Sequence, residues 1–297
     1  MTQPISTKAQ QLAQQFPPLM LAADRVAATV SQGLHGRRKV GQGETFWQFK
    51  PYQPGDSRHQ IDWRQSAKST NSKALYLKQN EWEACESVWL WSDRSRSMDY
   101  TSHVQYPEKS ERSLLLTLAL AALLMRSGEQ VAWFSGDNKP ASGRMAFNRM
   151  CFKQFETSST DLNLPQLAPL PRFAKVILFS DFLSPIQDIQ KLLSTLSAKG
   201  IQGHLIKISD PAETDWPFKG RMHFIDPETR IEKRIGQATN LTKEYQQAYT
   251  EHSEKLMNMT RSYGWCYHAH STSKSPEHAL LSLYQSLAIK PKDRNRC

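Results

Sequence analysis

One acidic residue and two hydroxyl residues alternate in the segment Asp93-Arg94-Ser95-Arg96-Ser97, directly after an apolar run that ends at Trp91. If this segment is extended, the three oxygen-bearing side chains can face one point. Carboxylate and hydroxyl oxygens are hard donors of the kind that Mg²⁺ or Mn²⁺ prefers. The spacing therefore predicts a metal site, although the same residues could equally form the N-cap of a helix.

A second carboxylate follows a second apolar run. Residues 176–179 form a compact run of the fully buried type, and they lead directly into Ser180 and Asp181. In a doubly wound sheet, ligands bind beyond the carboxyl ends of the strands, because the loops diverge there. Asp93 and Asp181 would then meet at one edge of the sheet, where their like charges repel unless a cation lies between them.

The elements that must position these residues alternate between strand and helix. Short apolar runs predict buried strands, and segments of helical periodicity separate them. The predicted strands are 87–91, 130–134, 175–179, 201–208 and 265–270, the predicted helices are 108–126, 186–197, 240–261 and 276–287, and a hairpin is predicted at 221–225 and 230–235. This order predicts an α/β fold with a doubly wound, mostly parallel sheet that has helices on both faces.

Composition predicts one globular core with an N-terminal helical and loop extension. The 297 residues are 39% hydrophobic and 22% charged, as in soluble globular proteins. We expect the extension over residues 1–83, with two short helices within 5–32, the α/β domain over 84–290 and a basic tail over 291–297. The four cysteines are far apart without a C-x-x-C pair, which argues against a zinc site or a disulfide framework. Packing in the core is the expected role of the strand aromatics Trp89, Trp91, Trp133 and Phe134.

The formal net charge of +10 is spread along the chain, which favours a solvated basic surface over a nucleic-acid footprint. A basic scaffold for nucleic acid or anionic membrane is the weakest of the alternatives. The longest apolar run, 114–125, has twelve residues, whereas about 20 span a bilayer. With no secretory signal visible, we expect a cytoplasmic protein, or one peripheral to a membrane through a partner.

The pattern Asp93-x-Ser95-x-Ser97 after an apolar strand resembles the metal-ion-dependent adhesion site of von Willebrand factor type A domains. The resemblance implies that a threonine from a second loop and an aspartate after a later strand complete the ligand set. Asp181 matches the aspartate and would act through water. Thr160 is the preferred threonine, because Thr160-Asp161-Leu162 resembles the family's motif at the start of a helix, and Thr157 is its competitor.

A longer series of motifs is similar to domain-of-unknown-function family 58. In chain order the motifs are Gly33-x-His35, Gly41-x-Gly43-Glu44-x-Phe46, Tyr52-x-Pro54-Gly55-Asp56, Ile61-Asp62-Trp63-Arg64-x-Ser66-Ala67, Ser180-Asp181-Phe182 and Ser209-Asp210-Pro211. The resemblance implies a von Willebrand factor A-like domain, in a family frequently encoded beside AAA-type ATPases of the MoxR group. Many members carry N-terminal membrane helices, which we do not expect here.

The N-terminal extension offers a second candidate surface. Its basic loop could bind an acidic strip or a phosphate, and the two motifs that follow could face a protein partner. The residues concerned are His35, Arg37, Arg38, Tyr52, Asp56, Asp62, Trp63 and Arg64. The alternative interpretation is structural: a solvated loop, then a turn, a tryptophan anchor and an ion pair that dock the extension.

The sequence contains no phosphate loop, nucleophile elbow or H-E-x-x-H motif. We therefore expect a protein that is not an enzyme: an adaptor in which bound Mg²⁺ or Mn²⁺ leaves a coordination position for a carboxylate of a client protein. The family resemblance implies a MoxR-type AAA ATPase or its client as the partner, in a chaperone-like or complex-maturation role. The alternative is a metal-dependent phosphoester hydrolase that uses the same acids to activate water.

Overall fold

The computed structural model describes residues 45–52, 61–67, 75–81, 87–135, 139–156, 163–171 and 174–288. The chain forms two compact units, one made of Leu34–Glu86 and the other containing the chain from Ser87 onward. Each unit is described by itself. The two short helices expected within 5–32 and the basic tail at 291–297 lie outside the described residues.

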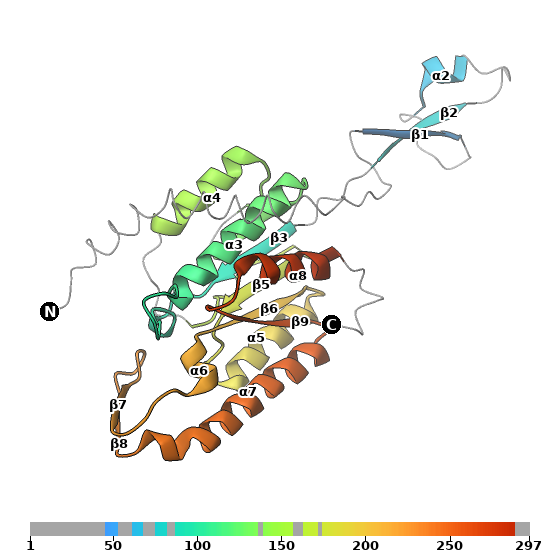
Figure 1. The fold of residues 1–297 in the computed structure, drawn as a ribbon. Helices are drawn as coiled ribbons and strands as arrows, with labels where there is room; N and C mark the ends of the chain where they lie inside the picture. Colours follow the sequence, from blue (N-terminus) through green and yellow to red (C-terminus); the bar gives the residue numbers. More distant parts are fainter. Residues whose placement is uncertain are drawn as a thin grey trace. The chain divides into compact units, whose positions relative to one another are not determined.

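A five-stranded sheet forms the centre of the larger unit (Figure 1). Its strands lie in the order β4-β3-β5-β6-β9, and every neighbouring pair is parallel. The strands are β3 Ser87–Ser92, β4 Gln130–Trp133, β5 Lys175–Ser180, β6 Gln202–Ser209 and β9 Cys266–Ser271. Because β4 lies on one side of β3 and the later strands lie on the other, the side on which the chain adds new strands reverses between β3 and β5.

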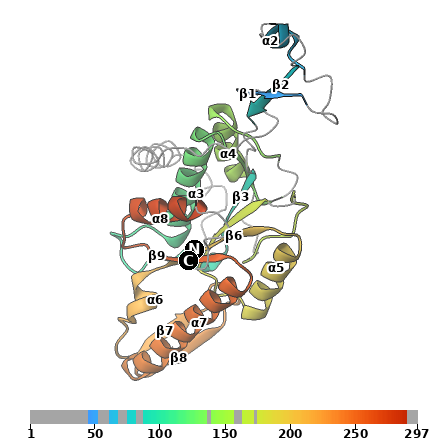
Figure 2. The ribbon, with the colours of Figure 1, turned by 90° about the vertical axis from the view of Figure 1, so that its right-hand side faces the viewer.

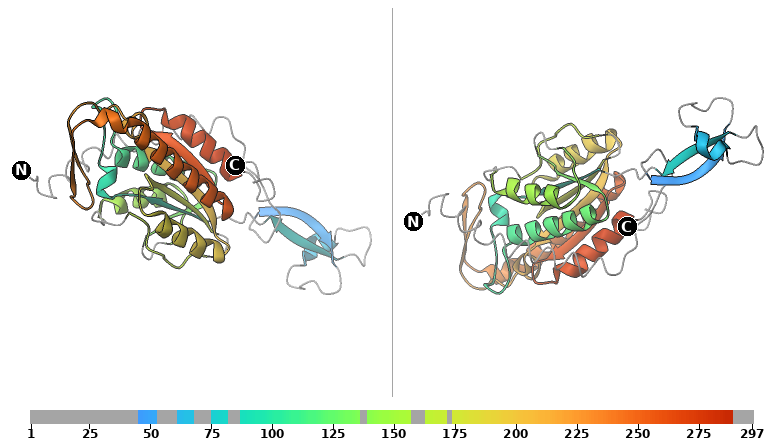
Figure 3. Two further views of the ribbon diagram at one scale, coloured as in Figure 1. Left: turned by 90° about the horizontal axis from the view of Figure 1, so that it is seen from below. Right: turned by 90° about the horizontal axis from the view of Figure 1, so that it is seen from above.

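Helices cover both faces of this sheet, as the turned views show (Figures 2 and 3). One face carries α3 Lys109–Arg126, α4 Arg144–Glu156 and α8 Pro276–Ala288, and the other carries α5 Ile186–Ala198 and α7 Thr242–Ser262. Shorter elements complete the unit: η2 Arg96–Met98, α6 Pro211–Asp215, η3 Ala238–Leu241 and the hairpin strands β7 Met222–Ile225 and β8 Glu232–Ile235. The predicted doubly wound α/β fold is confirmed.

The core explains why these strands are apolar along their whole length. A parallel strand covered on both faces has no solvent side, so nearly every residue of β5 is buried. Trp89, Trp133 and Phe134 are buried as predicted, and Trp91 is half-buried against the core cluster. Gly203 of β6 has a specific role in this packing, because an added Cβ would lie 1.9 Å from the Val176 carbonyl oxygen.

The smaller unit is a two-stranded antiparallel ribbon with one short helix. Its elements are β1 Thr45–Pro51, α2 Trp63–Ala67 and β2 Tyr76–Glu81. Ser66 Oγ donates to the Asp62 carbonyl at 2.8 Å and accepts from the Tyr76 amide at 2.9 Å, which ties the helix to the strand. Trp63 is 65% exposed on this unit.

Two parts of the larger unit differ from the sequence-based expectations. Helix α4 was not predicted. Its buried Phe147 and Met150 lie on one side of the helix, but the exposed Met145 and Phe152 are also apolar, so the sequence lacks a clear helical periodicity. The helix expected after Thr160 is absent from 163–171, where the described chain is irregular. Leu164 and Ala168 in that segment instead pack against the core as parts of a loop.

Candidate metal centre

Asp93 lies at the carboxyl end of β3, where the order of the sheet reverses. This crevice between β3 and β5 is the place at which doubly wound sheets bind ligands. The Asp93 amide donates to the Phe179 carbonyl at 2.8 Å, which continues the hydrogen bonding of the two strands and fixes the residue. Its side chain is 1% exposed.

The Asp93 carboxylate has hydrogen-bond donors but no countercharge among the described residues. The Ser95 amide donates to Oδ1 at 2.8 Å, and Ser180 Oγ donates to Oδ2 at 2.5 Å. Burial nevertheless raises the pKa of Asp93 to about 6, and the charge of Asp181 acts in the same direction. A cation bound at this carboxylate would offset the unfavourable burial of its charge.

The hydroxyl groups of Ser95 and Ser97 lie together beside Asp93, with their oxygens 3.1 Å apart. Ser95 is extended, with φ −64° and ψ 161°, and the chain then turns through η2. The structure thus brings the carboxylate and both hydroxyls of the segment to one place. This donor set fits a hard divalent cation such as Mg²⁺ or Mn²⁺.

Asp181, at the end of β5, contacts a cation that belongs to the protein itself. Lys109 Nζ lies 2.9 Å from Asp181 Oδ2, and the Leu183 amide donates to Oδ1 at 3.2 Å. Lys109, the first residue of α3, is 1% exposed, and its Nζ also lies 2.5 Å from Glu213 Oε1. The expectation that a cation must offset the charge of Asp181 therefore needs a correction, because Lys109 already does so.

Helix α6 holds Glu213 in place for this contact. Asp210 caps the helix by accepting from the Ala212 amide at 2.8 Å, and the Asp210 amide donates to Glu213 Oε2 at 3.0 Å. Burial lowers the pKa of Lys109, but the charges of Asp181 and Glu213 outweigh it, so the pKa is raised overall. The buried ammonium group therefore stays charged between two carboxylates.

Sequence reasoning missed Lys109 and Glu213, although both left a signal. A lysine in the first turn of a helix opposes the helix dipole, so its presence there indicates a specific partner. Asp210 and Glu213 have the spacing of a capping box, which predicts a helix start directly after β6. Neither signal identifies Asp181 as the partner, because that residue is 72 positions away.

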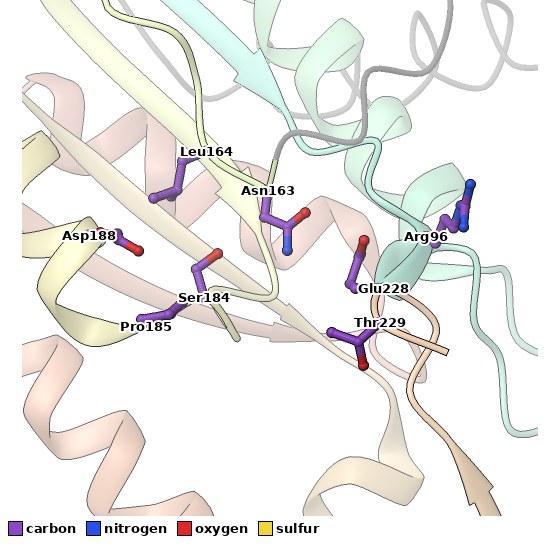
Figure 4. A pocket seen from close by; sticks show the side chains of 8 residues that line it. All are labelled: Arg96, Asn163, Leu164, Ser184, Pro185, Asp188, Glu228 and Thr229. Carbon is purple, nitrogen blue, oxygen red and sulfur yellow. The ribbon is translucent and has the colours of Figure 1, made fainter. Parts of the chain in front are cut away.

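The hairpin of β7 and β8 brings a further carboxylate to this edge of the sheet. The Ser97 amide donates to Glu228 Oε1 at 2.9 Å. A cavity of about 500 Å³ lies beside this contact, and Figure 4 shows the side chains around it. The cavity is lined by Arg96, Asn163, Leu164, Ser184, Pro185, Asp188, Glu228 and Thr229.

The remaining predicted residues lie in the smaller unit or outside the described chain. Tyr52, Asp62, Trp63 and Arg64 belong to the smaller unit. The residues outside the described ranges are Thr160, its competitor Thr157, His35, Arg37, Arg38 and Asp56. Within those ranges, no group of three or more His, Cys, Asp or Glu side chains is arranged to hold a metal ion. A centre at Asp93 therefore depends on serine hydroxyls.

The fold and this edge together define a class of protein: a doubly wound α/β domain with a carboxylate and hydroxyl loop at the reversal point of its sheet. The chain belongs to the family described as "Protein of unknown function DUF58", whose family model matches residues 48–255. The family membership implied by the ordered motifs is thereby confirmed.

Several solved structures are similar to the chain, and two of them come from species of Bacteroides. The first is an aerotolerance-related membrane protein from Bacteroides fragilis, with 14% identity, coverage of 68% of this chain and 98% of that chain, and a TM-score of 0.41. The second is the conserved hypothetical protein BatB from Bacteroides thetaiotaomicron, with 14% identity, the same two coverages of 68% and 98%, and a TM-score of 0.38. No curated protein matches the sequence. None of the helices in the described ranges combines the length and the apolar character needed to cross a membrane.

Proposed function

We propose that this protein is a magnesium-dependent adaptor that binds other proteins through a carboxylate. In this proposal Asp93, Ser95 and Ser97 hold Mg²⁺, or Mn²⁺ in its place, and Thr160 is the further ligand that the family resemblance implies. Asp181 stays on Lys109 and acts through a water molecule. When bound, the cation supplies an electrophilic position that an oxygen of the partner can occupy.

The buried carboxylate of Asp93 is the observation that carries the proposal. Its side chain is 1% exposed, burial raises its pKa to about 6, and the described residues provide no basic partner for it. A protein that keeps such a carboxylate beside two hydroxyls, at the ligand-binding edge of its sheet, has a use for a cation there. Lys109 neutralises Asp181 and not Asp93. Asp93 therefore has no countercharge among the described residues.

The loops around the site are suited to contact with another protein. Exposed apolar side chains stand on three loops that leave this edge of the sheet: Val104 before α3, Leu183 before α5, and Ile225 with Ile231 on the hairpin. Apolar groups around a polar anchor are typical of protein-binding surfaces. The resemblance to the family suggests a MoxR-type AAA ATPase, or a client that it remodels, as the partner.

The alternative of a phosphoester hydrolase gains no support from the geometry. Such a reaction would use Asp93 and Asp181 as bases toward water, but Asp181 is paired with Lys109 at 2.9 Å, and a carboxylate paired with an ammonium group can position a water molecule more readily than take up its proton. The adaptor therefore remains the better account of the site.

Metal titration of the purified protein tests the proposal. We expect calorimetry to show Mg²⁺ and Mn²⁺ binding by the wild type and at least about tenfold weaker binding by Asp93→Asn. Glu254→Gln, which removes an exposed carboxylate on α7, is the matched control and should bind as the wild type does. Partner capture from the native cell should then require Mg²⁺ and disappear in EDTA. Equal metal affinity of wild type and Asp93→Asn would contradict the proposal.

A further inference from the structure

The tip of the β7–β8 hairpin contacts the loop assigned to the cation. The Ser97 amide donates to Glu228 Oε1 at 2.9 Å, across 131 positions of sequence. Glu228 is half-buried, whereas its neighbours Pro227 and Thr229 are exposed. The hairpin therefore directs this carboxylate toward the loop and away from bulk solvent.

Asp226 organises the tip so that Glu228 is held in this orientation. Its Oδ1 accepts from the Glu228 amide at 2.9 Å, and its Oδ2 accepts from Thr229 Oγ1 at 2.6 Å. The Arg230 amide closes the turn by donating to the Asp226 carbonyl at 2.9 Å, with Arg230 in the left-handed region at φ 60°. An aspartate that caps its own turn restricts the tip to few conformations, so Glu228 is preorganised.

Only one oxygen of the Glu228 carboxylate is used in the contact with Ser97. Of the described residues, none donates a hydrogen bond to Oε2. The side chain of Ser97 is one of the proposed cation ligands, and its hydroxyl contacts the hydroxyl of Ser95. The Glu228 carboxylate therefore binds the backbone of a residue whose side chain is a proposed cation ligand. Figure 4 shows Glu228 near Arg96 and Thr229 among the residues that line the cavity.

The hairpin is fixed at its base and exposed at its tip. At the base, Phe224 stacks on Trp216 with ring centroids 5.4 Å apart and meets Phe218 edge-on at 5.3 Å. At the tip, Ile225 and Ile231 on either side of the turn are exposed. A displacement of the tip from Ser97 would therefore leave the aromatic contacts at the base intact.

We propose that Glu228 is an internal carboxylate ligand of this site, which a partner's carboxylate must replace. The inference rests on the proposed metal-dependent function and adds the chemistry of the partner to it. With Glu228 in place, the resting protein supplies the anionic oxygen itself. The partner then offers an Asp or Glu side chain on an exposed turn, and the apolar residues of the hairpin tip become available to contact it.

Manganese is a suitable probe, because its effect on water-proton relaxation reports the water molecules that reach the bound ion. We compare the wild-type chain with Glu228→Gln, and with Glu232→Gln as a control that removes a charge from the same hairpin. Glu232 pairs with His223 and has no contact with Ser97. We expect Glu228→Gln to bind Mn²⁺ about tenfold more weakly and to give a larger relaxation enhancement per bound ion. Glu232→Gln should match the wild type, and circular dichroism verifies the fold of both variants.

A carboxylate probe completes the test. N-acetylglutamate amide, added to the Mn²⁺-loaded protein, should reduce the relaxation enhancement at a lower concentration in Glu228→Gln than in the wild type. If Mn²⁺ binds wild type and Glu228→Gln with the same affinity and the same relaxation, the role of Glu228 is wrong while the metal site stands. If Mn²⁺ binds wild type and Asp93→Asn equally weakly, the metal site itself fails and the inference fails with it.

Discussion

Replacing Asp93 with Asn should make the metal-free protein more stable at neutral pH and less dependent on pH. Burial raises the pKa of Asp93 from 3.8 to about 6 in the folded protein. A rise of about two pKa units, at about 1.4 kcal/mol for each, corresponds to about 3 kcal/mol. Between pH 3.8 and about 6 the folded protein keeps the proton that the unfolded chain has lost, so the free energy of unfolding falls as pH rises.

Above about pH 6 the folded carboxylate is ionised as well, and the decrease in the free energy of unfolding is complete. The amide side chain introduced by Asp93→Asn has nearly the same shape and does not titrate. We therefore expect the difference in unfolding free energy, Asp93→Asn minus wild type, to grow by about 2.4 kcal/mol between pH 4 and 7, because part of the full change falls below pH 4.

Urea unfolding in EDTA, followed by tryptophan fluorescence, measures this difference, and the other titrating groups cancel in it. Saturating Mg²⁺ at neutral pH should reverse the order of stability. A cation at 1,000 times its Kd adds about 4.1 kcal/mol to the wild type, which exceeds the penalty of burying the charged carboxylate, and the variant lacks the carboxylate needed to hold the cation. A difference that stays constant from pH 4 to 7 would refute the reasoning, because Asp93 would then have the same pKa in both states.

Two further substitutions test the packing that positions the site. Lys109→Met should lower the free energy of unfolding by about 3–5 kcal/mol, because two buried carboxylates lose their common cation. Lys199→Met, at an exposed position, should change it little in the same urea titration. Gly203→Ala should destabilise the domain by about 3 kcal/mol, since its Cβ would meet the Val176 carbonyl at 1.9 Å. Thermal unfolding should show no comparable loss for Gly236→Ala, where nothing lies within 4 Å of the added atom.

The architecture could be predicted because its signals are local. Apolar runs such as 175–179 and the long helical pattern at 109–126 are visible without knowledge of any distant residue. Helix α4 was missed for an equally local reason, since its apolar residues do not lie on one side. The position of Asp93 and Asp181 at one edge followed from strand polarity alone, because parallel neighbours share their carboxyl ends.

The partners of those carboxylates could not be predicted in the same way. Lys109 contacts acids that are 72 and 104 positions away, and Glu228 contacts Ser97 across 131 positions. No periodicity or spacing encodes such pairs, because they form only when helices and loops meet above the folded sheet. The sequence therefore predicted that Asp93 and Asp181 lie at this edge, whereas Lys109, Glu213 and Glu228 were identified only from the structure.

The ion triad of Lys109, Asp181 and Glu213 is built entirely from the protein's own side chains. Many small metalloproteins unfold when their ion is removed, because the ion is a structural part of the core. Here an ammonium group performs that neutralising task permanently, so the domain can fold and persist before any divalent ion arrives. If Asp93 binds a divalent ion as proposed, its occupancy would be separate from structural integrity and could vary with the supply of the ion as a reversible signal.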